Sequence, residues 1–397
     1  MKEDELITDL FRAYFDARKN KRNTINQIKF EIDYEKNLIE LCEDIKNRSY
    51  HISPSICFIS EKPVKREIFA ADFRDRVVHH LLFNYISPVF EQIFIDDSYS
   101  CRKGKGTMYG IRRIENFIYE CSRAYTSDCY ILKLDIHGYF MSIDKDILYR
   151  QLDCFISEAA RNTAGNDFPE TDTDLVMYLI EKVLSDDPTL NCRVKGRRND
   201  WQGLPPSKSL FHSGYNCGLP IGNLTSQLFS NVYLHPLDCF VKNTLAMPYY
   251  GRYVDDFAII HPDKEKLKKV IGQISEFLKD RLCLNLHPKK IYLQDYSKGV
   301  NFLGAAIKPY RTYISRRTKQ NFISCIHSLN KKLSHREPSK SELAEMRAKI
   351  NSYLGIMSHY YTYNIRKKYL LERENLLFNY GYLTTGLRNY VLKKEYR

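Results

Sequence analysis

The stretch Arg-Tyr-Val-Asp-Asp-Phe-Ala-Ile-Ile, residues 252–260, places two adjacent aspartates inside an otherwise apolar run. Successive side chains of a strand point to opposite faces, so one of two neighbouring aspartates would face the wrong way. A tight hairpin bend at Asp255 and Asp256 removes this conflict and crowds two negative charges together. Divalent cations neutralise such crowding. The alternative is a plain polar turn, for which Asn-Gly or Asp-Gly would be the usual choice.

A third carboxylate lies upstream, in residues 130–144, Tyr-Ile-Leu-Lys-Leu-Asp-Ile-His-Gly-Tyr-Phe-Met-Ser-Ile-Asp. An apolar strand carries Asp135 at its end and breaks at Gly138. Alone, Asp135 would be an ordinary turn residue. With Asp255 and Asp256 it forms a trio of oxygen ligands of the kind that holds a Mg²⁺ pair for in-line phosphoryl transfer. In that chemistry the metal ions activate the attacking hydroxyl and stabilise the leaving pyrophosphate, so no His or Cys nucleophile is needed.

These segments resemble the palm of reverse transcriptases of the group II intron-like branch. The resemblance runs in order through about residues 60–310 and rests on six blocks: Pro63–Val77, Ser98–Ile114, Asp135–Ile143, Gly218–Asp238, Leu284–Leu293 and Val300–Ile307. It implies an RNA-directed DNA polymerase with an α+β fold and a right-hand architecture, in which fingers, a ferredoxin-like palm and a helical thumb follow one another.

The block before the paired aspartates departs from the common pattern. Most reverse transcriptases carry Pro-Gln-Gly there, whereas residues 218–227 read Gly-Leu-Pro-Ile-Gly-Asn-Leu-Thr-Ser-Gln, with Ile221 in the Gln position. The pattern is similar to that of diversity-generating retroelement reverse transcriptases. Those enzymes copy a template RNA into cDNA with frequent errors opposite adenine, and the cDNA rewrites a variable target gene.

A Gln in this position could hydrogen-bond the incoming nucleotide, whereas Ile221 can only pack against it. The loss of one oriented contact could lower discrimination by an amount on the order of 1–3 kcal/mol. A neutral apolar replacement in another lineage is the alternative. Unassigned and phage-defence reverse transcriptases carry similar blocks.

The resemblance also implies a role for each matching position. Asp135, Asp255 and Asp256 would be catalytic, and together with Ile136 they would hold two Mg²⁺ ions, for which Mn²⁺ could substitute. Phe140, five residues after Asp135, would be an aromatic gate beneath the sugar that clashes with a 2′-hydroxyl; a core Phe is the alternative. The expected dNTP-binding residues are Arg66, Arg74, Arg76, Phe140, Ile221, Gly222, Asn223, Gln227 and Lys290.

Four of these positions are basic. Arg66, Arg74 and Arg76 match fingers residues that grip the triphosphate, a task that suits the planar fork of a guanidinium group. Any one of them could instead be a solvated surface charge. Lys290 matches a late palm lysine proposed to protonate the leaving pyrophosphate.

The formal net charge of +13 is unevenly distributed over the 397 residues. Residues 311–397 contain 18 Lys and Arg against 6 Asp and Glu, a net of +12, which leaves only +1 for residues 1–310. The basic segment is rich in Tyr and has helical spacing, as in Leu343, Met346 and Ile350. It fits a thumb that tracks a nucleic-acid backbone, although an anionic membrane surface or an acidic partner would also attract it.

The pattern of elements predicts four parts: an N-terminal helical extension at 1–50, fingers at 51–125, a palm at 126–309 with an insertion at about 155–217, and a basic helical thumb at 310–397. Within the fingers we expect a helix from Arg74 to Ile86 that ends before Pro88. In the insertion, a group of basic residues and the only Trp could touch template RNA or belong to a solvated loop; they are Arg193, Lys195, Arg197, Arg198 and Trp201.

The lack of a targeting signal and the spacing of the cysteines favour a cytoplasmic protein. The eleven cysteines form no Cys-x-x-Cys pair or zinc-type cluster, as expected of buried thiols in a reducing compartment. The N-terminus has no signal-peptide pattern, and no apolar run approaches the ~20 residues of a membrane span.

The expected partners are template RNA, the RNA/cDNA duplex and dNTPs, and no membrane. For the diversity-generating subtype the resemblance adds a dedicated structured RNA and a small basic accessory protein. Two other functions stay open: an antiphage reverse transcriptase that makes defensive cDNA, and a non-catalytic RNA-binding scaffold. The complete carboxylate trio argues against the scaffold.

Overall fold

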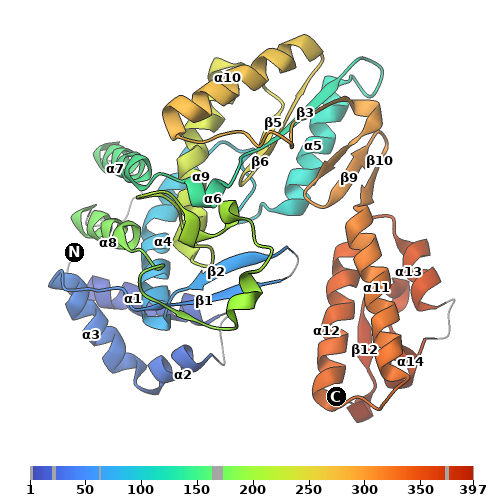
Figure 1. Cartoon of the computed structure of the whole chain (residues 1–397), viewed down its shortest axis with the longest axis horizontal. Helices are drawn as coiled ribbons and strands as arrows, with labels where there is room; N and C mark the ends of the chain where they lie inside the picture. Colours follow the sequence, from blue (N-terminus) through green and yellow to red (C-terminus); the bar gives the residue numbers. More distant parts are fainter. Residues whose placement is uncertain (1–2, 20–23, 62–63, 163–172, 372–374, 397) are drawn as a thin grey trace. The chain divides into compact units, whose positions relative to one another are not determined.

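A computed structural model gives the structure of the chain (Figure 1). It describes residues 3–19, 24–61, 64–162, 173–371 and 375–396. Pro63 of the first predicted fingers block and residues 163–172 of the predicted insertion lie outside these ranges. The chain forms two compact units, one of Met1–Arg113 with Leu132–Leu293 and one of Ile114–Ile131 with Gln294–Arg397.

A four-stranded sheet with the order β5-β6-β3-β7 belongs mostly to the first unit. Its strands are β3 (Tyr130–Asp135), β5 (Tyr250–Tyr253), β6 (Asp256–His261) and β7 (Tyr292–Asp295). Helices including α9 (Leu224–Cys239) connect β3 to β5, and α10 (Lys264–Leu282) connects β6 to β7. This βαββαβ connectivity is ferredoxin-like. The predicted α+β fold with a ferredoxin-like palm is therefore confirmed.

The sequence of α10 shows why an element forms where it does. Asp263 caps its first turn by accepting hydrogen bonds from the backbone N–H groups of Glu265 and Lys266. The helix ends at Cys283, which adopts a left-handed φ of 51°. Apolar residues at helical spacing form its buried face: Leu267, Val270, Ile274, Leu278 and Leu282.

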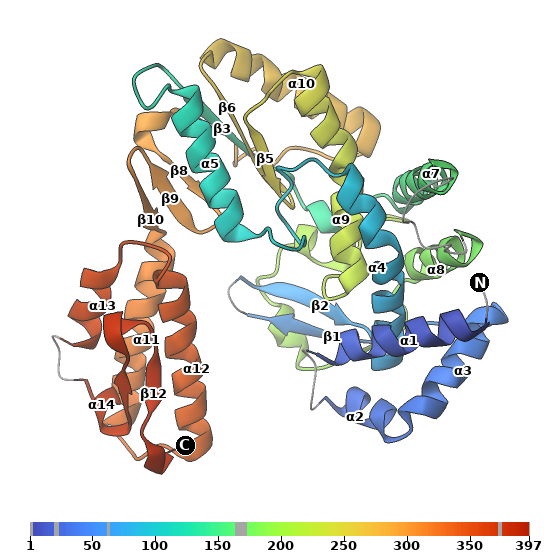
Figure 2. The same cartoon turned by 180° about the vertical axis from the view of Figure 1, so that it is seen from behind.

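The fingers sheet has the order β2-β1-β4. Its strands are β1 (Ser55–Ser60), β2 (Arg66–Ala70) and β4 (Cys192–Val194). Three N-terminal helices precede this sheet in the sequence: α1 (Glu3–Arg18), α2 (Ile25–Ile32) and α3 (Tyr34–Lys46). Helix α1 packs against α4 (Phe73–Ile93) and crosses it, as Figure 2 shows.

Helix α4 continues through Pro88, so the predicted helix end before that residue is wrong. A proline inside a helix removes a backbone hydrogen bond and costs about 3 kcal/mol. Tyr85, Ile86, Val89 and Phe90 on either side are all buried. Because burying each such side chain contributes about 1.5–3 kcal/mol, packing outweighs the cost of the proline.

A buried carboxylate anchors the predicted insertion to the fingers sheet. Glu67 of β2 is 1% exposed and accepts hydrogen bonds from Trp201 Nε1 at 2.6 Å, Ser209 Oγ at 2.9 Å and the Leu210 backbone N–H at 2.6 Å. Trp201 is therefore held within the fold by Glu67, and its predicted contact with template RNA stays a prediction. The nearby Arg193, Lys195 and Arg197 are exposed. The helices of this region are α7 (Lys145–Asn162) and α8 (Thr173–Ser185).

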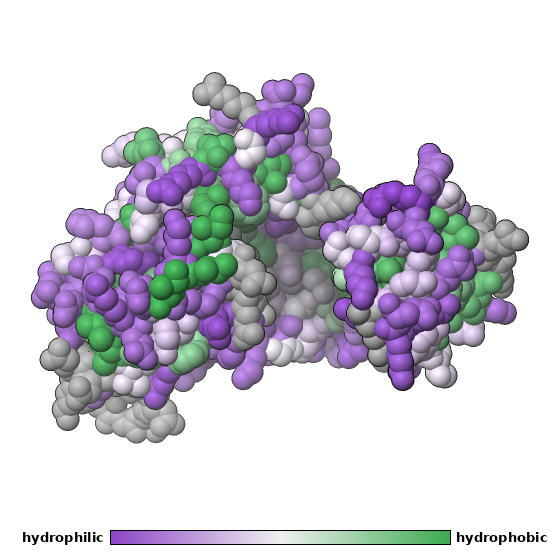
Figure 3. All heavy atoms as spheres, turned by 90° about the horizontal axis from the view of Figure 1, so that it is seen from below, coloured by the Kyte–Doolittle hydropathy of each residue, from purple (hydrophilic) through white to green (hydrophobic). Residues whose placement is uncertain are grey.

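The second unit combines two small antiparallel sheets, β10-β9-β8 and β11-β12, with helices. Its elements are α5 (Thr107–Cys121, which begins in the first unit), β8 (Val300–Phe302), β9 (Ala305–Lys308), β10 (Arg311–Ile314), α11 (Arg316–Leu333), α12 (Lys340–Met357), α13 (Tyr363–Leu370), α14 (Leu377–Tyr380), β11 (Gly381–Leu383) and β12 (Tyr390–Leu392). Phe322, Ile350 and Leu354 lie in its apolar core. Hydrophilic side chains cover much of the face that Figure 3 presents. Within the described ranges, no helix is both long and apolar enough to span a membrane.

Candidate active site

The β5–β6 hairpin presents the two adjacent aspartates. Tyr253 pairs with Asp256, so the two-residue bend consists of Val254 and Asp255, and Asp256 begins β6. The prediction that both aspartates form the bend is wrong by one residue. The buried run that follows Asp256 fixes this register, since it must face the core. Val254 takes a left-handed φ of 56°, which is unfavourable for a β-branched residue.

Strand β3 brings Asp135 to the same place as the hairpin. The backbone N–H of Ile136 donates to the Asp255 carbonyl at 3.3 Å, and that of His287 donates to the Asp135 carbonyl at 2.8 Å. The structure thus brings together residues that are far apart in the sequence. The side chain of Ile136 is a buried hydrocarbon without a donor atom, so only the backbone carbonyl of this residue could serve as a metal ligand.

Burial and mutual repulsion perturb these carboxyl groups. Burial raises the pKa of Asp255 to about 6, and the negative charges of Asp135 and Asp256 add to the increase. Burial also raises the pKa of Asp256, while the positive charge of Lys133 opposes that increase. Perturbed acids of this kind cluster at functional sites, where a bound cation can offset the repulsion.

Two lysine side chains neutralise part of this charge. Lys290 Nζ lies 2.8 Å from Asp135 Oδ2, and Lys133 Nζ lies 3.0 Å from Asp256 Oδ1. With the side chains so placed, no three His, Cys, Asp or Glu residues in the described ranges are arranged to hold a metal ion. Lys133 was not among the predicted site residues. Its position two residues before Asp135 on a strand could have revealed it, because such side chains share a face.

Phe140 and Ile221 lie close together. Phe140 belongs to the short helix α6 (Tyr139–Ser142), and its carbonyl accepts a hydrogen bond of 2.8 Å from the Leu219 N–H. Both side chains are half-buried and pack against a single cluster of Cys57, Phe69, Met141 and Leu210. The predicted sugar gate and the unusual isoleucine therefore share an apolar wall that keeps some exposed surface.

The loop that contains Ile221 forms hydrogen bonds with β2 and with the residue that follows this strand. The Phe69 N–H donates to the Ile221 carbonyl at 2.9 Å, and the Ala71 N–H donates to Asn223 Oδ1 at 3.2 Å. A Cβ on Gly222, whose φ is 132°, would lie 2.9 Å from the Phe69 carbonyl oxygen, so only glycine fits this close approach. Gln227 is exposed on α9.

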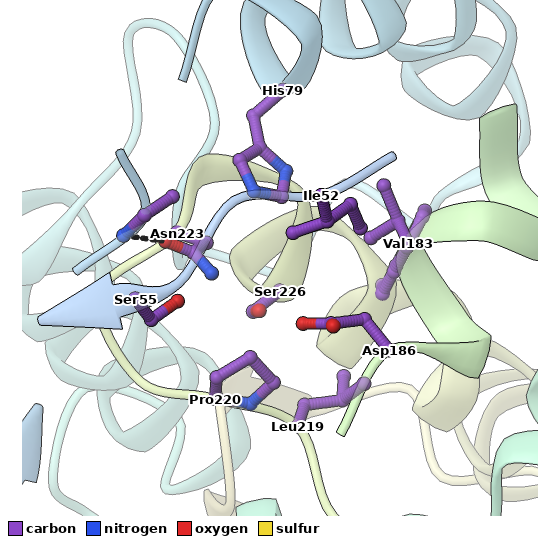
Figure 4. A pocket seen from close by; sticks show the side chains of 11 residues that line it. Ile52, Ser55, His79, Val183, Asp186, Leu219, Pro220, Asn223 and Ser226 are labelled. Carbon is purple, nitrogen blue, oxygen red and sulfur yellow. Dashed lines mark hydrogen bonds between the residues drawn. The ribbon is translucent and has the colours of Figure 1, made fainter. Parts of the chain in front are cut away.

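Asn223 also borders a small cavity of about 20 Å³ (Figure 4). Polar side chains from four separate segments surround it: Ser55, His79, Asp186, Asn223 and Ser226. A cavity of this size holds about one water molecule. The predicted nucleotide contact Asn223 is therefore engaged in holding β2 and lining this interior space.

The three fingers arginines occupy different surroundings. Arg66 is exposed at the start of β2, and its positive charge acts on Tyr253 beside the hairpin by lowering that phenol's pKa against the effect of burial. Arg74 forms an ion pair with Asp44 of α3. Arg76 is half-buried, and burial lowers the pKa of its guanidinium group. Of the three, only Arg66 acts on a residue of the hairpin, Tyr253, while Arg74 is bound to the N-terminal helix α3.

Comparisons with known proteins agree with this arrangement. Residues 62–307 match the reverse transcriptase (RNA-dependent DNA polymerase) family. No curated protein matches the chain.

Two solved telomerase structures are among those similar to the chain. An apo telomerase from Candida tropicalis, truncated from its C-terminal domain, is 15% identical with a TM-score of 0.45, over 71% of this chain and 60% of that chain. A telomerase from Candida albicans in complex with a fragment of telomeric RNA is 11% identical with a TM-score of 0.45, over 86% of this chain and 64% of that chain. The chain thus spans less than two thirds of either structure's length.

Proposed function

The chain belongs to the reverse transcriptase (RNA-dependent DNA polymerase) family, and on this premise we propose that it copies an RNA template into DNA by adding dNTPs to a primer. The meeting of Asp135 with the Asp255–Asp256 hairpin at one end of a ferredoxin-like palm is the observation that carries the proposal. The template RNA and the RNA/cDNA duplex would be its macromolecular ligands.

The donor set suits Mg²⁺, which prefers hard oxygen ligands. Asp135, Asp255, Asp256 and the Ile136 carbonyl would hold two such ions, with Mn²⁺ as a substitute. Two bound cations would activate the primer hydroxyl and neutralise charge on the leaving pyrophosphate. To bind them, Asp135 and Asp256 must exchange their lysine partners for metal.

Several side chains would position the nucleotide. Phe140 and Ile221 offer an apolar wall to the sugar and base, and the exposed Arg66 offers its guanidinium fork to the triphosphate. Lys290, which forms an ion pair with Asp135, would donate a proton to the pyrophosphate. The eleven cysteines are free thiols, which supports our placing of the reaction in the reducing cytoplasm.

Primer extension on a defined RNA template with Mg²⁺ tests the proposed reaction, and sequencing of the cDNA reports its errors in the same experiment. Incorporation of dNTPs by the wild-type chain is the expected result. A folded wild-type chain that binds RNA and incorporates no dNTP would overturn the proposal in favour of an RNA-binding scaffold.

We further propose error-prone synthesis for a diversity-generating retroelement, with its structured RNA and a small basic accessory protein as partners. The apolar packing of Ile221 supports this subtype, because its side chain offers the nucleotide no hydrogen bond. A template/variable repeat pair beside the gene would support the proposal, whereas a defence gene cluster would favour an antiphage role.

Substitution Ile221→Gln is expected to lower misincorporation opposite template adenine by about fivefold, the effect of one hydrogen bond worth about 1 kcal/mol. The Ile221→Leu variant is the matched control, since it keeps an apolar side chain and should keep the wild-type errors. Deep sequencing of cDNA from all three proteins gives the comparison. An identical error spectrum in Ile221→Gln and wild type would contradict a role for Ile221 in fidelity.

Divalent-cation binding is expected to weaken as the pH falls through about 6. Asp255, with a pKa of about 6, is ionised above that pH and protonated below it, and a carboxyl group must lose its proton to bind a metal. Affinity should therefore be level at higher pH and fall by up to about tenfold per unit below 6. Titration with Mn²⁺, followed by electron paramagnetic resonance between about pH 7.5 and about pH 5, measures this; a flat profile would contradict it.

A further inference from the structure

Buried side chains hold the strained residue Val254 at both of its backbone polar groups. Arg252 Nη1 donates to the Val254 carbonyl at 3.1 Å, and the Val254 N–H donates to Ser100 Oγ at 3.1 Å. A left-handed valine persists only where its surroundings enforce that conformation. Val254 directly precedes Asp255 in the bend, so its backbone sets the direction of that carboxylate.

Arg252 is itself fixed from several sides. Its guanidinium group is 0% exposed and forms a bidentate ion pair with Asp238 of α9, with Nε at 2.7 Å from Oδ1 and Nη2 at 2.5 Å from Oδ2. Tyr250 donates its hydroxyl to the same carboxylate at 2.6 Å. Two parallel hydrogen bonds fix the plane of the guanidinium group and therefore the position of the remaining Nη1.

Ser100 is held by two hydrogen bonds to the side chain of Asn231 of α9. Ser100 Oγ donates to Asn231 Oδ1 at 2.9 Å, and Asn231 Nδ2 donates to the Ser100 carbonyl at 2.8 Å. Arg252 Nη1 also reaches Asn231 Oδ1, at 3.3 Å. The two groups that hold Val254 are thus linked to each other and to one helix.

Stability alone does not account for a buried ion pair of this kind. Removing two charges from water costs about as much as their attraction returns, and apolar pairs of similar volume often replace such ion pairs without loss. The pair between Arg252 and Asp238 does, however, deliver a donor to one backbone carbonyl at the bend. This geometry favours a role in orientation.

We propose that Arg252, Asp238 and Ser100 form a clamp that positions Asp255 by fixing the backbone of Val254. The clamp rests on the proposed function only in that Asp255 must be a metal ligand. Its members are positioning residues, because none of their side chains belongs to the proposed metal or nucleotide contacts. Loosening the clamp should misdirect the carboxylate and weaken metal use while leaving nucleotide binding intact.

Ser100→Ala tests the clamp, and Ser98→Ala is its matched control. Both serines are 0% exposed, and Ser98 Oγ accepts a hydrogen bond from Arg252 Nη2 at 3.3 Å, but only Ser100 bonds to Val254. We expect Ser100→Ala to lower kcat about tenfold and to raise the Mg²⁺ concentration for half-maximal synthesis, with an unchanged KM for dNTP. Ser98→Ala should stay within about twofold of wild type. Arg252 is a poorer target, because its removal leaves Asp238 buried and unpaired.

A second pair of variants, Val254→Gly with and without Ser100→Ala, distinguishes an effect on backbone orientation from an effect on packing. Glycine adopts a left-handed φ without strain, so a bend with Val254→Gly depends less on the clamp. The loss caused by Ser100→Ala should therefore shrink from about tenfold to about twofold when both are measured in the Val254→Gly background.

Two results would overturn the clamp: equal activity and Mg²⁺ dependence in Ser100→Ala and Ser98→Ala, or an undiminished loss in the Val254→Gly background. Wild-type inactivity, in contrast, would be a failure of the proposed polymerase. In that case Mn²⁺ affinity replaces synthesis as the readout, and the clamp is overturned if Ser100→Ala and Ser98→Ala bind Mn²⁺ equally.

Discussion

Replacing Asp255 with asparagine is expected to abolish DNA synthesis, by about 10³-fold or more, and at the same time to stabilise the folded protein. Asparagine keeps the shape of the side chain but loses the charge that would bind Mg²⁺. Losing several kcal/mol of transition-state stabilisation corresponds to a rate loss of this size. The gain in stability follows from the raised pKa of Asp255.

The sign of the stability change can be worked out from that pKa. A carboxyl group whose pKa rises from 3.8 to about 6 on folding is ionised at a cost of about 3 kcal/mol at neutral pH. The cost appears as the pH rises from 3.8 through about 6, and it is absent where both states are protonated. Asparagine carries no such cost, so metal-free Asp255→Asn should unfold at a temperature a few degrees higher than wild type near neutral pH.

Calorimetry and primer extension on the same preparations give both readouts. Asp280→Asn, the same chemical change at an exposed residue of α10, should alter neither. Full synthesis by Asp255→Asn would contradict the metal-ligand role. Lost synthesis together with a lower unfolding temperature would show that asparagine damages the fold, which would contradict the stabilisation.

Replacing Phe140 with alanine is expected to lower the preference for dNTP over rNTP by about two orders of magnitude. A ring beneath the sugar excludes the 2′-hydroxyl by contact, and alanine leaves space for it; a contact worth about 3 kcal/mol corresponds to this factor. The ratio of kcat/KM for dCTP and CTP measures it. Phe140→Tyr keeps the ring and should keep the preference.

The same variant separates the gate from a purely structural phenylalanine. Phe140 packs against the cluster that contains Cys57 and Phe69, so its truncation should also lower stability, by less than the about 3–5 kcal/mol of a fully buried Phe. A lower unfolding temperature with unchanged sugar preference would mean that Phe140 serves only the core.

Much of the fold was predictable because local patterns carry it. The apolar run that carries Asp135 stands in the sequence, and β3 forms there as expected. The amphipathic spacing of α10 is an equally local pattern, although no prediction named that helix. Pro88 shows where local rules fail. Its cost is local, whereas the packing that outweighs it comes from partners elsewhere in the chain, which no local pattern reveals.

The candidate site was predictable in its residues but less so in their partners. Resemblance and spacing pointed to Asp135 and the Asp255–Asp256 pair, which the structure brings together. The observed bend lies one residue before the predicted one, because the buried strand sets the pairing register and the turn residues alone do not. Arg74 forms an ion pair with Asp44, and Asn223 accepts a hydrogen bond from Ala71. Both interactions involve partners that are far away in the sequence, so no local pattern predicts them.

The ammonium groups of Lys133 and Lys290 also bear on how the protein is made. Three clustered anions would ordinarily burden a nascent chain until an inorganic counterion arrived. Here Lys133 and Lys290 supply positive charge to two of the three carboxylates, Asp256 and Asp135, from within the chain itself. We therefore expect the chain to fold without divalent cations, which would bind afterwards and displace the two lysine side chains from the carboxylates.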